Sequence, residues 1–125
     1  MAAVLGHSRR ESGMVTAEAA LVIPMLLLVA VVCGWIVAVG AAQVRLIDAA
    51  REGARLAGRG EPPAVVEAAI EQTGPDGTTG QVSPGANTVT VHVSARVEPG
   101  LPLLDLLPAV TLDSSATSAL EVPDG

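Results

Sequence analysis

Residues 19–44 read AALVIPMLLLVAVVCGWIVAVGAAQV, and this stretch decides how the chain folds. It holds 26 residues without one Asp, Glu, Lys or Arg, between Glu18 and Arg45. An apolar run of this length is typical of a helix that spans the hydrocarbon core of a bilayer. The apolar core of a secretory signal peptide is shorter, about 7–15 residues. We therefore predict a transmembrane segment at about residues 19–42.

The helix is expected to continue beyond the membrane. From Gln43 to Ala57 there is no proline and only one glycine, and helix-favouring residues dominate. One face carries the charges Arg45, Asp48, Glu52, Arg55 and Arg59, and the opposite face carries Leu46, Ala49, Ala50, Gly53, Leu56 and Ala57. This spacing predicts ion pairs Arg45–Asp48 and Glu52–Arg55. A helix from about residue 14 to 58 would be roughly 65 Å long, so its second half must stand outside the bilayer.

The remaining sequence, residues 61–125, predicts a small α+β region. Pro62 and Pro63 suit the start of a short helix at about 63–72, and Gly74–Gly80 has turn chemistry. Thr88–Val97 alternates strictly between apolar and polar residues, which is typical of a strand. Gln81–Ser83 and Val110–Val122 are further strand candidates. We expect an antiparallel sheet of two or three strands with one face against the long helix.

Composition limits what this region can do alone. Beyond residue 60 there is no Phe, Tyr or Trp, so its core is thin and should need help from the long helix or from neighbouring subunits. The chain has formal charge −6, no Lys and one aromatic residue, Trp35. A nucleic-acid partner is not expected, because both a basic patch and a stacking surface are missing.

The sequence contains no constellation that predicts catalysis. His7 lies near the start and His92 on the polar face of a predicted strand, where we interpret it as a surface side chain. The single cysteine, Cys33, lies mid-span and is interpreted as a small buried hydrophobe. We expect no enzyme activity, no small-molecule substrate, no cofactor and no metal.

Two features of the helix are candidates for assembly. Gly34, Ala38 and Ala42 recur every four residues, and such a stripe of small residues lets another helix approach closely. Pro24 removes one hydrogen bond and is expected to kink the helix. Glu18 is either an interfacial carboxylate that the helix dipole favours, or a charge that pairs with an amine at a buried site.

The junction from Arg9 to Glu18, RRESGMVTAE, resembles a type IV prepilin processing site. The resemblance implies that residues 1–13 form a leader, that a prepilin peptidase cuts after Gly13, and that Glu18 becomes the fifth mature residue. The cut would leave an ammonium on Met14, one helical turn from Glu18. In type IV pilins such a pairing, within a subunit or with the next one, is thought to dock each subunit into the filament.

The chain as a whole resembles the TadE-like family of pilin-related proteins, which belong to tight-adherence (Tad, Flp-type IVb) systems. The resemblance rests on residues 13–18, the span through Pro24, the stretch DAAREGAR at residues 48–55, and two C-terminal segments, Leu101–Leu104 and Ser114–Thr117. The composition, rich in Ala, Gly, Val and Arg, is similar to that of actinobacterial members. The sequence departs from major type IV pilins at Met14, where phenylalanine is usual, and in its short C-terminal part.

This resemblance implies a minor pilin or pseudopilin of a cell-surface filament or secretion assembly, with other pilin-like subunits and the Tad assembly platform as partners. It also implies a cytoplasmic N-terminus and an extracytoplasmic C-terminal part in a single-pass membrane protein. Counting arginines at the two ends of the span does not by itself favour that orientation. Two alternatives stay open. One is an uncleaved single-pass protein that presents a small binding module, and the other is a product secreted by cleavage after Ala38-Val39-Gly40.

Overall fold

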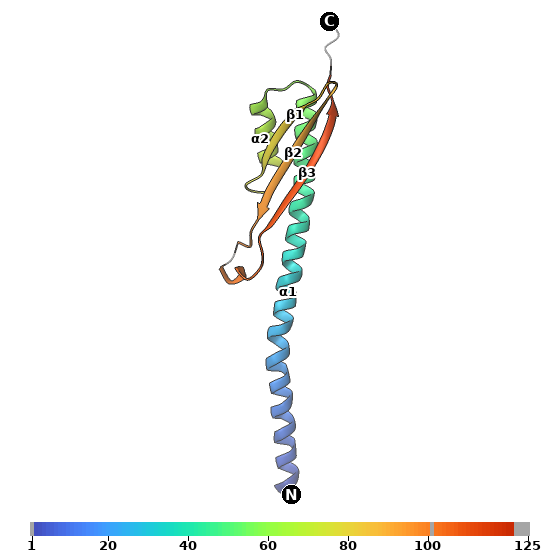
Figure 1. Ribbon diagram of the computed structural model, residues 1–125. Helices are drawn as coiled ribbons and strands as arrows, with labels where there is room; N and C mark the ends of the chain where they lie inside the picture. The colour runs from blue at the N-terminus through green and yellow to red at the C-terminus, as the bar shows by residue number, and fades with distance from the viewer. Residues whose placement is uncertain (1, 101, 122–125) are drawn as a thin grey trace. The chain divides into compact units, whose positions relative to one another are not determined.

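The fold was analysed in a computed structural model that describes residues 2–100 and 102–121, the side chains of residues 2–10 and 103 excepted. Its elements are α1 (Ala2–Gly58), α2 (Pro63–Thr73), β1 (Thr79–Pro84), β2 (Thr88–Val97), the 3-10 helix η1 (Pro102–Leu104) and β3 (Val110–Ala119) (Figure 1). This is the expected α+β arrangement of a long first helix, a short second helix and a small antiparallel sheet. The chain divides into two compact units, Met1–Ile36 and Val37–Gly125. Met1, Leu101 and Val122, on which parts of the predictions fell, lie outside the described residues.

The first unit consists of the N-terminal part of α1, up to Ile36. The helix begins at Ala2, whereas the sequence predicted a start near residue 14. Ala, Leu, Arg and Glu in the first 13 residues favour a helix, and no proline interrupts them, so residues 2–13 continue the same helix. The helix also runs without a break through Pro24. The domain boundaries predicted at residues 13 and 60 stay predictions.

In the second unit, α1 places its apolar face inside, as predicted. Leu46, Ala49 and Ala50 are fully buried, and Ala54 and Ala57 are nearly so. The helix ends at Gly58, and Gly60 adopts a positive φ of 80° before the two prolines. A residue with a side chain is strained at that φ, so Gly60 suits the turn.

The charged face of α1 is confirmed, with one pairing corrected. Arg55 Nη2 lies 2.6 Å from Glu52 Oε1, as expected. Asp48, however, pairs with Arg51 at 3.9 Å, and not with Arg45. The Arg45 guanidinium instead donates from Nη2 to the carbonyl oxygen of Gly74, at 3.0 Å. A side chain taken for part of a solvated face therefore ties α1 to the C-terminal end of α2.

The three strands form an antiparallel sheet in the order β1-β2-β3. On β2, Val89, Val91, Val93 and Ala95 are buried, which confirms the predicted alternation. Strand β1 is longer than expected. Thr79 and Gly80 were predicted to lie in a turn, but they pair with Ser94 and Val93 and so belong to the strand.

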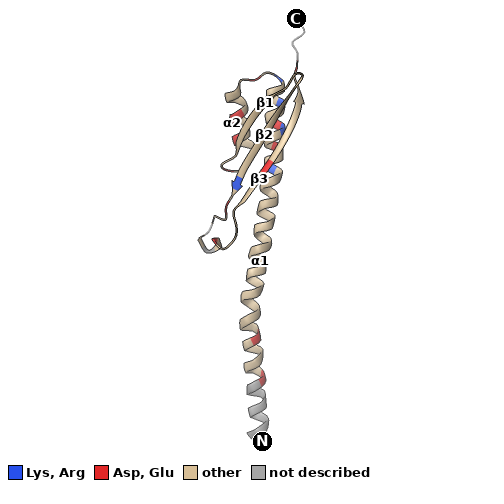
Figure 2. Ribbon diagram, in the orientation of Figure 1, with Lys and Arg blue, Asp and Glu red and all other residues tan. Residues whose placement is uncertain are grey.

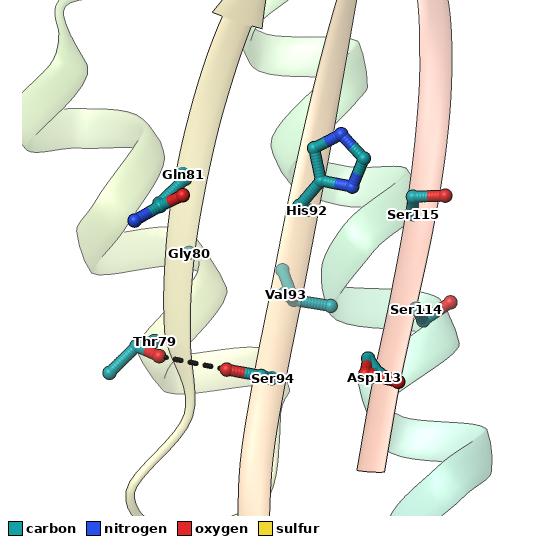
Figure 3. A pocket seen from close by; sticks show the side chains of 9 residues that line it. All are labelled: Thr79, Gly80, Gln81, His92, Val93, Ser94, Asp113, Ser114 and Ser115. Carbon is teal, nitrogen blue, oxygen red and sulfur yellow. Dashed lines mark hydrogen bonds between the residues drawn. The ribbon is translucent and has the colours of Figure 1, made fainter.

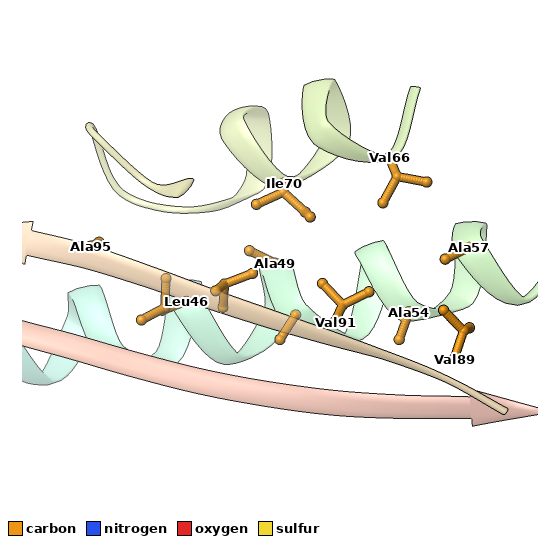
Figure 4. Close-up of a cluster of buried hydrophobic side chains, with 11 residues drawn as sticks. Leu46, Ala49, Ala54, Ala57, Val66, Ile70, Val89, Val91 and Ala95 are labelled. Carbon is orange, nitrogen blue, oxygen red and sulfur yellow. The ribbon is translucent and has the colours of Figure 1, made fainter. Parts of the chain in front are cut away.

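The core of the second unit lies between α1, α2 and the sheet (Figure 4). Its largest fully buried side chains are Leu46, Ile70, Val66, Val91 and Val93. Figure 4 shows Val66 and Ile70 pointing from α2 toward the residues of α1 and β2. Leu46 and four buried alanines of α1 thus complete the core of the region after residue 60, and the dependence of that region's stability on the helix stays a prediction.

Candidate functional site

The predicted processing junction lies in an exposed part of α1. Gly13 is exposed, and a Cβ added there would have no atom within 4 Å. Met14 is 66% exposed. The hydroxyl of Thr16 donates to the carbonyl oxygen of Ser12, at 2.8 Å, so this bond bridges the Gly13–Met14 peptide. The junction is therefore accessible and is held in a helical conformation.

Glu18 is exposed on the same helix, four residues after Met14. Residues at this spacing lie one above the other on a helix, because Cβ atoms at i and i+4 share a face. The ion pairs among the described side chains are Asp48–Arg51, Glu52–Arg55 and Arg96–Glu98, so Glu18 takes part in none of them. An amine created at Met14 would lie about 6 Å along the axis from Glu18.

The helix after Glu18 turns apolar side chains outward. Leu21 is 77% exposed, Met25 68% and Val37 70%. Figure 2 shows a stretch of α1 without charged residues between its acidic residues near the N-terminus and the charged residues beside the sheet. Among the described residues, α1 is the helix that is long and apolar enough to cross a bilayer. Cys33 is exposed on this stretch, and not buried as we had expected.

The three residues of the small-residue stripe do not have equal access to a partner. Gly34 and Ala38 are exposed, and a Cβ at Gly34 would have no atom within 4 Å. Ala42 is buried within its own unit, at 8% exposure. Close packing of a second helix on this face stays a prediction, and Gly34 and Ala38 are the residues that remain open to it.

A second candidate site lies on the outer face of the sheet (Figure 3). A shallow depression of about 610 Å³ is lined by Thr79, Gly80, Gln81, His92, Val93, Ser94, Asp113, Ser114 and Ser115. The register places Gln81, His92 and Ser115 side by side across the three strands. Thr79 and Ser94 form a hydroxyl–hydroxyl bond of 3.2 Å in the next row.

This depression offers hydrogen bonds to a polar group. Its side chains carry hydroxyls, one amide, one imidazole and one carboxylate, and none of the described residues group three His, Cys, Asp or Glu side chains in a way that could hold a metal. Sequence reasoning had placed His92 correctly on the surface but had not found the depression. The sequence pattern that indicates the depression is the presence of Thr, Gln, His and Ser at alternate strand positions. These residues come together only through the pairing register of the three strands.

Comparisons with known proteins give no match: no family model fits the chain, and no curated protein or solved structure is significantly similar to it.

Proposed function

We propose that this chain is a non-enzymatic structural subunit, a minor pilin or pseudopilin of a Tad/Flp-type pilus or a related secretion assembly. The observation that carries the proposal is the distribution of residues along α1. The helix has an exposed apolar stretch with a single carboxylate at its start, and its C-terminal part supplies buried residues to the core of the α+β unit. Such a chain can be stored in a membrane and later packed by its apolar stretch against other helices.

The apolar stretch suits the membrane stage. Its 26 uncharged residues, in helical conformation, are about 39 Å long and so exceed the roughly 30 Å hydrocarbon core. Apart from the one hydrogen bond that Pro24 removes, the backbone groups within such a helix are satisfied internally, as a bilayer requires. In this proposal the N-terminus is cytoplasmic, the chain passes the cell membrane once, and the unit from Val37 onward is largely extracytoplasmic.

Glu18 is the residue that we assign to assembly. A carboxylate in an apolar environment is costly unless a cation pairs with it. Cleavage after Gly13 by a prepilin peptidase would create an ammonium at Met14 that can pair with Glu18. The N-terminal ammonium of a neighbouring pilin-like subunit can pair with Glu18 in the same way. Gly34 and Ala38 would then let the neighbouring helix come close.

The N-terminal residue of the mature protein in membranes tests this proposal. We expect Met14, read by mass spectrometry of the membrane fraction. Met1 would contradict the pilin proposal and support an uncleaved anchor, whereas a residue near Ala41 would show secretion after signal-peptidase cleavage.

A second candidate function is an uncleaved single-pass protein that presents a binding module. The polar depression around His92 favours it, because hydroxyl, amide and imidazole groups gather there on one exposed face. This candidate predicts a full-length chain that begins at Met1 and is absent from surface filaments. The same mass measurement therefore separates the two functions.

A further inference from the structure

The loop between β2 and β3 is unusually apolar for an exposed connection. Residues 99–109 read PGLPLLDLLPA, with five leucines in seven positions, Leu101 to Leu107. Leu106 is 94% exposed, and Leu104 and Leu107 are half-buried. A single exposed leucine needs no explanation, but a cluster of apolar side chains on a surface marks an interaction site.

Contacts of β3 show which end of the unit carries this loop. A Cβ at Gly58 would lie 2.7 Å from Ser118 Oγ, and the amide of Glu121 donates to the carbonyl of Gly58 at 2.9 Å. Toward its other end, the strand accepts a bond from Gln43 Nε2 at the carbonyl of Asp113, at 3.4 Å. Strand β3 therefore lies along α1, with Asp113 beside Gln43 and its C-terminal end beside Gly58.

The rises of strand and helix place the loop at about the level of the last turns of the apolar run. Val110 precedes Asp113 by three residues, which span about 10 Å in a strand. A helix needs about seven residues to cover the same distance. Val110 therefore reaches roughly the level of Val37, which belongs to the same compact unit. The loop continues beyond Val110, at the end of the sheet opposite the β1–β2 turn (Figure 1).

We infer that the loop around Leu104, Leu106 and Leu107 is a second membrane contact, and that these three leucines insert into the interfacial region of the bilayer near the end of the span. This inference rests on the proposed membrane anchoring by α1, and it does not depend on cleavage or filament assembly. The occupant is lipid because Val37–Ala42, the helix turns at the level of the loop, are themselves the last turns of the uncharged run. Apolar side chains at that depth gain by burial among acyl chains.

The charges near the loop set its depth. Arg96 Nε lies 2.8 Å from Glu98 Oε1, so that carboxylate is paired. Asp105 is exposed between the leucines, and a carboxylate is costly in the hydrocarbon core but not at the headgroup level. The loop therefore lies at the interface. It fixes the rotation of the α+β unit above the membrane, which a single helix alone leaves free.

Site-specific quenching in nanodiscs tests the inference on the full chain. The variant Cys33→Ser/Leu106→Cys carries one thiol for an environment-sensitive fluorophore, and its fold should be unaffected because Leu106 is almost fully exposed. The protein is reconstituted at one copy per phosphatidylcholine disc, which excludes contact with a second copy. Brominated acyl chains, present in one set of discs and absent from the other, quench a fluorophore that contacts lipid. Two controls use the native Cys33 and the variant Cys33→Ser/Ser83→Cys, because exposed Ser83 lies at the opposite end of the sheet.

We expect blue-shifted emission and loss of intensity in brominated discs for probes at Cys33 and at position 106, and neither effect at position 83. Quenching at Cys33 without quenching at position 106 overturns the loop contact and leaves the membrane anchor intact. A blue shift at position 106 without quenching shows protein cover, and also overturns it. If neither probe is quenched, the membrane anchoring fails and the loop contact fails with it.

Discussion

Ile70 of α2 lies directly against the backbone of Gly53 in α1. A Cβ added at Gly53 would be 2.9 Å from Ile70 Cδ1 and 3.2 Å from Val91 Cγ1. The same isoleucine reaches Gly80 of β1, where an added Cβ would be 2.6 Å from Cδ1. Ile70 therefore fills the space that two glycines leave open, and it joins α1, α2 and the sheet.

Gly53→Ala should destabilise the α+β unit in spite of the better helix propensity of alanine. The propensity gain is up to about 1 kcal/mol, but forcing an extra methyl into a packed core typically costs about 1–3 kcal/mol. Thermal unfolding of the full chain in detergent measures the change. Gly40→Ala is the matched control, because a Cβ there meets no atom within 4 Å.

A double-mutant cycle identifies the cause. Ile70→Ala removes both Cδ1 and Cγ1, each of which would lie 2.9 Å from a Cβ added at Gly53, and should itself cost about 2–5 kcal/mol. If the clash is with Ile70, the double variant Gly53→Ala/Ile70→Ala costs less than the sum of the single changes. Strict additivity would show that the close approach between these two residues does not limit the site.

The second prediction concerns the dependence of the sheet on α1. A fragment of residues 60–125 loses Leu46 and the four buried alanines, so it should keep some strand signal in circular dichroism but unfold at low denaturant. A fragment of residues 37–125 keeps the whole core and should unfold cooperatively. Equal stability of the two fragments would show that the helix is not part of the folding unit.

The third prediction is a pH effect at Glu52. Its pKa is lowered, chiefly by the hydrogen bond from Arg55, against an opposing effect of desolvation, and the positive charges of Arg55 and Arg59 lower it further. A carboxyl whose pKa is lower in the folded state contributes stability above its ordinary pKa of about 4.3. That contribution is lost as the pH falls through the folded-state pKa.

The Arg55→Gln variant should therefore raise the pKa of Glu52 toward its ordinary value. NMR titration of the Glu52 carboxyl measures it. Arg51→Gln, which removes a neighbouring charge that pairs with Asp48, should leave the value unchanged. An equal shift of the Glu52 pKa in both variants would show that the total positive charge nearby lowers the pKa, and not the hydrogen bond from Arg55.

Much of the fold could be predicted because its signals are local. The alternation around Val91, the two faces of α1 and the prolines at 62 and 63 each depend on neighbours in sequence. The Arg45–Gly74 bond could not be predicted, because it joins residues 29 apart. The contact between Gly53 and Ile70 could not be predicted either, because these residues are also far apart in the sequence.

The candidate site was predicted only in part. The junction of Gly13, Met14 and Glu18 stands out because it marks the start of an uncharged run. The polar depression was missed, because alternate Thr, His and Ser residues are typical of any solvated strand face. Only the pairing of Gln81, His92 and Ser115 across three strands gathers them.

The fourth prediction concerns processing. Gly13→Leu should leave the full-length chain in the membrane, because a bulky residue blocks recognition by the peptidase. Misfolding is not expected to obscure this test, because Gly13 is exposed and a Cβ added there has no atom within 4 Å. Gly34→Leu, a matched change in an equally open part of α1, should mature normally. Normal maturation of Gly13→Leu would assign the cut to another protease or another bond.

The last prediction concerns Glu18 and the central claim of filament assembly. Glu18→Gln keeps the size and hydrogen bonding of the side chain but removes its charge. Membrane insertion should survive or improve, since a buried carboxylate costs roughly 2.5–3.5 kcal/mol at the bilayer centre and less near the interface. Incorporation into filaments should fall, because the ammonium of Met14 loses its counter-charge. An interfacial helix-end charge would change stability by only about 0.3–1 kcal/mol and leave assembly intact.

The most direct measurement is the ratio of protein in sheared surface filaments to protein retained in the membrane, for wild type, Glu18→Gln and the control Glu67→Gln. Glu67 is exposed on α2, so its neutralisation matches the charge change elsewhere in the chain. We predict wild-type protein in the sheared fraction, a reduced ratio for Glu18→Gln and an unchanged ratio for Glu67→Gln. Absence of the wild-type chain from filaments, or an unchanged Glu18→Gln ratio with cleavage after Gly13 intact, would contradict the account.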